Sequence, residues 1–142
     1  MFIRISVPFL GLLACLISEA DTDVETRAAK HFAAALYEKV SKLALEDLEG
    51  SGLAQSDIDS IVDEAVFRSA KCIIDSVALL PDDTHSKVVE MLADGEDLGH
   101  ALEPIEDAVK SHPNPKELDE RRRIFVDDCM ATVNQDLGIS IN

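Results

Sequence analysis

The segment DIDSIVDEAVFRSAKCIIDSVALL, residues 57–80, decides the fold class of this chain. Its apolar side chains recur every three or four residues, which is the spacing of one face of an α-helix and not of a strand. We expect a helix over residues 57–79, begun by Ser56 as its N-cap and ended by Pro81. Because its apolar face is wide, this helix should be the most deeply buried element. The face consists of Ile58, Ile61, Val62, Ala65, Val66, Ser69, Cys72, Ile73, Val77 and Leu80.

The segment before it shows the same helical spacing. Residues 24–48 predict a helix that ends where Gly50 and Gly52 allow a turn. Its expected inward stripe is Phe32, Leu36, Val40 and Leu43.

Three further helices are expected after residue 80. Residues 81–93 and 97–110 predict two short ones, of which the first ends at Gly95 and the second is kinked or restarted at Pro104. Residues 115–137 predict a long last helix. Its expected core side is Leu118, Phe125, Cys129, Val133 and Leu137, and Gly138 follows its end. The fold class is therefore all-α, a compact bundle of about five helices.

The first 20 residues differ from the rest in composition. Arg4 gives a short positive start, residues 5–17 are almost wholly apolar, and small side chains stand at Ser18 and Ala20. This order is typical of a secretory signal peptide, and the apolar run is shorter than the roughly 20 residues of a membrane span. We expect residues 1–20 to be a signal peptide and residues 21–142 a single helical domain. An uncleaved anchor or a buried first helix is the alternative.

The chain is strongly acidic, with 28 Asp and Glu against 13 Lys and Arg and a formal net charge of −15. Such a surface repels phosphate backbones and anionic lipid headgroups. We therefore expect no nucleic-acid partner. No second apolar stretch of spanning length follows residue 20, so stable membrane insertion is not expected either. The predicted localisation is extracellular, as a secreted protein.

Two cysteines, Cys72 and Cys129, follow the predicted signal peptide. An even pair in a secreted chain indicates one disulfide, which would stabilise the fold by roughly 4 kcal/mol in the chain-entropy model. Two buried free thiols or an intermolecular bridge are the alternatives.

The chain shows no strong pattern for catalysis. It has no Gly-x-Ser-x-Gly, no phosphate-binding glycine loop and no His-Glu-x-x-His. Asp82 and Asp83 with His85 come nearest to a metal cluster, but helix capping explains these aspartates and Thr84 better. We expect that the chain is not an enzyme and that it has neither a metal site nor a cofactor.

The order of elements resembles one unit of the nematode polyprotein allergens, which are secreted helical proteins that bind fatty acids and retinoids. The resemblance covers residues 72–129. It rests on the spacing of the two cysteines and on the acidic hairpin MLADGED, residues 91–97. It implies a helical carrier of small hydrophobic ligands, and no individual binding residue carries over beyond the cysteine pair.

Two functions follow as hypotheses. The first is a carrier that buries a small hydrophobic ligand, such as a fatty acid, among its aliphatic side chains, with Arg122 at the ligand's carboxylate. Arg122 belongs to the basic run 121–123, which alternatively is a solvated face paired with nearby acids. The expected ligand-binding residues are Phe32, Leu36, Val66, Ile73, Arg122, Phe125 and Val133. The alternative function is a secreted factor of the effector, venom, reproductive or cytokine-like kind that binds an extracellular protein through its surface.

Overall fold

The computed structural model describes residues 11–81 and 83–140, and every regular element within these ranges is helical. The five-helix, all-α prediction is confirmed. The elements in chain order are α1 (Gly11–Leu48), α2 (Gln55–Ser76), the 3-10 turn η1 (Val77–Leu79), α3 (Thr84–Ala93), α4 (Leu98–Ser111) and α5 (Pro115–Leu137).

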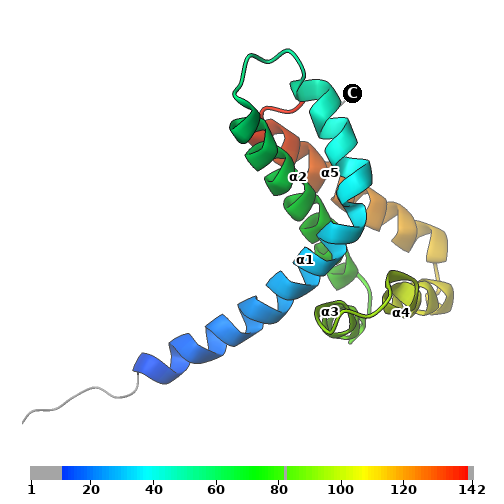
Figure 1. Cartoon of the computed structure of the whole chain (residues 1–142). Coiled ribbons are helices and arrows are strands. Elements are labelled where there is room, and N and C mark those ends of the chain that lie inside the picture. The colour runs from blue at the N-terminus through cyan, green and yellow to red at the C-terminus, as the bar shows by residue number, and fades with distance from the viewer. Residues whose placement is uncertain (1–10, 82, 141–142) are drawn as a thin grey trace, which may run out of the picture.

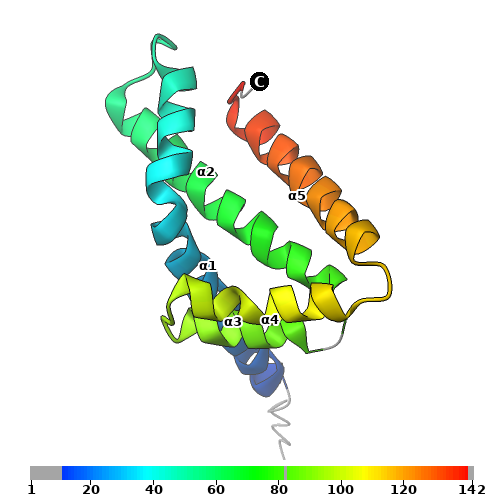
Figure 2. The same ribbon diagram turned by 90° about the vertical axis from the view of Figure 1, so that its right-hand side faces the viewer.

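Helix α2 lies between α1 and α5 (Figure 1, Figure 2). The short connection after α1 turns the chain back, so that α1 and α2 form an antiparallel pair. The α3–α4 hairpin crosses one end of this pair, with α3 packed against α1 and α4 packed against α3. Helix α5 then returns along the other side of α2 (Figure 2).

Local sequence explains where the later helices begin and end. Gly95 has a φ of +78°, and the Glu96 N–H donates to the Met91 carbonyl at 3.1 Å, which ends α3 as predicted. Asp97 then begins α4, because its carboxylate accepts a hydrogen bond from the Gly99 N–H at 3.0 Å. The predicted ends of α5 are also confirmed, with proline in the first turn and Gly138 left-handed at φ +68°.

Helix α1 begins at Gly11, whereas the sequence pattern placed its start at residue 24. No glycine or proline interrupts residues 12–48, so nothing in the sequence ends a helix before Leu48. The apolar part of a signal peptide is itself compatible with a helix. The cleavage expected after residue 20 therefore stays a prediction, and residues 1–10 lie outside the described part of the chain.

The predicted N-cap of α2 is wrong, and of the two outcomes expected at Pro104 the restart does not occur. Ala54 is the N-cap of α2, and Ser56 lies inside the first turn, because the Asp57 and Ile58 N–H groups both donate to the Ala54 carbonyl. Helix α4 runs through Pro104 without a restart. Proline removes one backbone donor, and the residue four positions earlier, His100, is exposed, so water can reach the carbonyl left without its partner.

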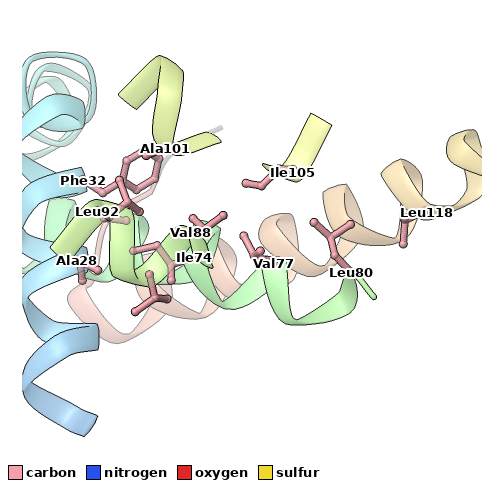
Figure 3. Close-up of a cluster of buried hydrophobic side chains, with 13 residues drawn as sticks. Ala28, Phe32, Ile74, Val77, Leu80, Val88, Leu92, Ala101, Ile105 and Leu118 are labelled. Carbon is pink, nitrogen blue, oxygen red and sulfur yellow. The ribbon is translucent and has the colours of Figure 1, made fainter. Parts of the chain in front are cut away.

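The larger of two apolar cores, here the lower core, lies where the α3–α4 hairpin meets α1 and α2 (Figure 3). Leu92 and Ala101 have no exposed surface there, and Phe32 is 4% exposed. The buried members are Ala28, Ala29, Phe32, Ala70, Ile74, Val77, Leu80, Val88, Val89, Leu92, Ala101, Ile105 and Leu118.

The upper core fills the other end of the α1–α2 pair. Its buried members are Ala44, Leu48, Val62, Ala65, Val66 and Ile139. Between the cores, the predicted stripe of α1 is only partly covered, and Leu43 is 44% exposed rather than buried. On α1, Phe32 is buried in the lower core and Ala44 is buried in the upper core. Leu43 precedes Ala44 by one residue and therefore points away from the helix face that Ala44 occupies.

Helix α5 is attached mainly near its two ends. Leu118 enters the lower core, whereas Leu137 and Ile139 pack into the upper core. The Ser140 N–H also donates to the Asp47 carboxylate at 2.8 Å. Within α5 only Leu118 and Val133 are buried, so the middle of the helix relies on other contacts with α2.

Candidate functional site

The middle of α5 is attached to α2 by the disulfide between Cys72 and Cys129. The two sulfur atoms lie 1.98 Å apart, and the residues are separated by 57 positions in the sequence. The predicted intramolecular bridge is confirmed. Cys72 is 2% exposed, whereas Cys129 keeps part of its surface accessible.

A groove runs along the outer side of the α2–α5 contact. It is open to solvent and has a volume of about 290 Å³. The two cysteines and Val133 line it, and polar side chains border them. The lining residues are Arg68, Lys71, Cys72, Asp75, Cys129, Thr132 and Val133.

The groove follows the contact between α2 with η1 and α5, where both sides place their side chains at the same spacing along the helix. On α2 and η1 the residues are Arg68, Cys72, Asp75 and Leu79, and on α5 they are Phe125, Cys129, Thr132 and Asp136. Each set follows steps of four, three and four residues, which keep side chains on one helix face. At one end Arg68 pairs with Asp136 at 2.8 Å. At the other end both stripes finish in an exposed apolar side chain.

Ion pairs balance much of the charge around the groove. The Lys71 ammonium lies 3.3 Å from the Asp75 carboxylate, one turn further along α2. With Arg68, the lining therefore contains two cations and one carboxylate. Because Arg68 is itself paired with Asp136 at the end of the groove, the charges here balance, in contrast to the net charge of −15 on the chain.

Arg122 is half-buried between α5 and the end of α2. One of its terminal nitrogens lies 3.5 Å from the Ser76 hydroxyl, and its buried Nε has no hydrogen-bond partner within the described structure. Burial lowers the pKa of this guanidinium from its ordinary value, and the carboxylate of Asp119 opposes that effect. The neighbouring Arg123 instead pairs with Glu120 at 2.6 Å, as expected for a solvated helix face.

The seven predicted ligand-binding residues do not line one cavity. Phe32 is buried in the lower core with Leu36 and Ile73 packed against it, and Val66 is buried in the upper core. Val133 lines the groove, whereas Arg122 is not among its lining residues.

Phe125 was predicted to face the core, and that prediction is wrong, because its side chain is 37% exposed. Helix α5 packs against α2, α4 and η1. Phe125 lies seven residues after Leu118 and so on the same side of α5, but Leu118 enters the lower core whereas Phe125 stays outside it.

Several surface residues were not anticipated as site candidates. Leu79 in η1 is 37% exposed and Ile124 in α5 is 49% exposed. Ile124 departs from the apolar stripe of α5, and this departure was visible in the sequence as a hydrophobic residue on a polar face. The groove cations Arg68 and Lys71 precede Cys72 by four residues and by one, so their place beside the predicted disulfide was visible in the sequence, whereas the groove itself depends on the packing of α5.

No group of three or more His, Cys, Asp or Glu side chains is gathered for a metal ion within residues 24–81 and 83–140. None of the helices in the described ranges combines the length and the apolar character needed to cross a membrane.

Comparisons of the chain with protein-family models, with curated proteins and with solved structures found no match. The resemblance to a polyprotein allergen unit therefore stays a prediction.

Proposed function

We propose that this chain is a secreted protein that acts by binding a cationic extracellular protein through the outer surface of α5 and η1. The disulfide supports the extracellular setting, because such bonds persist in oxidising compartments and are rare in the cytosol. The predicted signal peptide points to the same setting.

The observation that carries this proposal is the exposure of three large apolar side chains on α5 and η1; four others, Tyr37, Leu43, Leu45 and Leu53, are exposed on α1 and the loop after it. Ile124 and Phe125 are consecutive in α5, and Leu79 lies in η1, which packs against α5. Exposed apolar groups surrounded by polar residues are common contact points between proteins, and aromatic side chains are enriched there. An exposed apolar surface favours the protein-binding hypothesis, whereas an enclosed apolar cavity would favour the carrier hypothesis.

Charge indicates the chemistry of the partner. Glu120, Asp127 and Asp128 lie three or four residues from Ile124, as does Arg121, and Arg123 pairs with Glu120 and Asp127, so this part of the helix surface is only slightly acidic. The net charge of −15 adds a long-range field that attracts cations and repels anions. A partner that has an apolar patch surrounded by basic residues is complementary both to the exposed apolar side chains and to the negative charge.

The groove is less suited to the carrier hypothesis. Pockets for small ligands enclose about 300–1,000 Å³ and bury most of the ligand. The groove has about 290 Å³ and is open to solvent. Phe32 and Val66, which the carrier hypothesis needs as walls, are instead packed into separate cores. The surface-binding hypothesis is therefore the better supported of the two.

Differential capture from the fluid into which the protein is secreted tests this proposal. The immobilised wild-type chain should retain a basic protein that an Ile124→Ser/Phe125→Ser variant does not retain. Leu53→Ser is the matched control, because Leu53 is 44% exposed but lies in the α1–α2 loop, outside α5 and η1. Capture by all three chains alike would contradict the proposed surface.

Native mass spectrometry separates the two hypotheses. A protein purified from its own source without detergent should show the bare chain. An added mass of a few hundred daltons that is lost on denaturation would instead support the carrier and overturn the proposal.

A further inference from the structure

The outer groove places a disulfide sulfur where a small molecule can reach it. Both cysteines line the groove, but Cys72 is almost wholly buried and Cys129 is partly exposed. Of the two sulfurs, that of Cys129 is therefore the more accessible from solvent. A volume of about 290 Å³ beside it admits a small molecule but not a folded domain.

We infer that Cys129 is a thiol-exchange site, at which a small thiol enters the α2–α5 groove and forms a mixed disulfide. This inference needs no partner protein and so does not depend on the function proposed above. The chemical class it takes is a low-molecular-weight thiol such as glutathione or cysteine.

The paired charges around the groove repel an incoming thiolate less than the acidic chain as a whole does. The attacking species is a thiolate, which the chain as a whole repels through its net charge of −15. Arg68 and Lys71 stand beside the disulfide, Lys71 paired with Asp75 inside the lining and Arg68 paired with Asp136 at the end of the groove, so the charges next to the sulfur atoms balance. Arg68 stands four residues before Cys72 in α2, and Lys71 stands one residue before it. Cations this close stabilise negative charge on the Cys72 sulfur, which is the sulfur that leaves.

The step is balanced without any other reagent. The thiolate attacks the sulfur of Cys129, a new sulfur–sulfur bond forms there, and the bond to Cys72 breaks. The electron pair passes to the Cys72 sulfur, which then takes a proton from water. The chain gains the mass of one thiol and remains a single molecule. The middle of α5 is then no longer tied to α2, although its ends keep their contacts in the two cores.

Intact-mass and peptide analysis of the folded, oxidised chain treated with reduced glutathione tests this inference. Samples quenched with acid over time should contain one adduct, located on Cys129, with Cys72 recovered as a thiol. An adduct on Cys72 would overturn it. So would full reduction without any adduct, or reaction only after the chain is unfolded in urea.

A charge variant tests the role of the groove itself. Lys71→Gln should slow adduct formation by about two- to fivefold, which corresponds to roughly 0.4–1 kcal/mol, within the range of an exposed charge interaction. Lys116→Gln is the matched control, because it removes the same charge about 20 Å away along α5, at about 1.5 Å per residue. The control should react at the wild-type rate. Equal slowing in both variants would show that only net charge matters and would contradict the assigned site.

Discussion

Removing the disulfide should destabilise the fold by about 4 kcal/mol. The Cys72–Cys129 bridge closes a loop of 57 residues, and the chain-entropy model assigns about that free energy to a loop of this length. Domains of ordinary size unfold with about 5–15 kcal/mol, so this is a large share of the total. The large value is consistent with the structure, because α5 has only two buried side chains of its own.

Urea unfolding followed by circular dichroism measures this effect on the Cys72→Ala/Cys129→Ala variant. With a slope of about 2 kcal/mol per molar urea, the midpoint should fall by about 2 M. The reduced wild-type chain is the control, because it keeps both side chains and loses only the cross-link. A loss below about 1 kcal/mol in both chains would refute the reasoning and show that the ends of α5 hold it without the bridge.

Three further predictions concern single side chains. Leu92→Ala should destabilise the fold by about 2–5 kcal/mol, measured by the same urea titration, because Leu92 has no exposed surface in the lower core. Gly138→Ala should cost about 1 kcal/mol, because φ at this position is +68°; no loss would contradict the left-handed end of α5. Arg123 holds the pKa of Glu120 below its ordinary value, so this pair stabilises the fold at neutral pH and loses its effect as the pH falls through the lowered pKa. Carbon-detected NMR titration should show the Glu120 pKa rising in Arg123→Gln, and an unchanged value would contradict the ion pair.

Much of the fold could be predicted because its signals are local. The apolar spacing of residues 57–80 identified α2, and Gly95, Pro115 and Gly138 marked helix ends that depend only on neighbouring backbone groups. The error in the predicted start of α2 also comes from relying on a local signal, the capping preference of serine. Ser56 is a good capping residue, but Ala54 supplies the carbonyl that begins the helix.

The candidate surface could not be predicted, because helical spacing identifies an apolar face without showing what covers it. Leu43 and Phe125 both continue apolar stripes, yet neither belongs to a buried core and both side chains are exposed. The disulfide was predictable from the number of cysteines. The groove beside it was not, since Arg68 and Lys71 meet Cys129 only through the packing of α5 on α2.

Site-specific photocrosslinking tests the central claim most directly. A photoreactive phenylalanine analogue at position 125, in the chain exposed to its own extracellular fluid, should form a covalent adduct with one basic protein. The same analogue at position 53, which is similarly exposed in the α1–α2 loop, should not. An adduct at position 125 alone is the result that surface binding by α5 predicts. Equal adducts at both positions, or none at position 125, would contradict it.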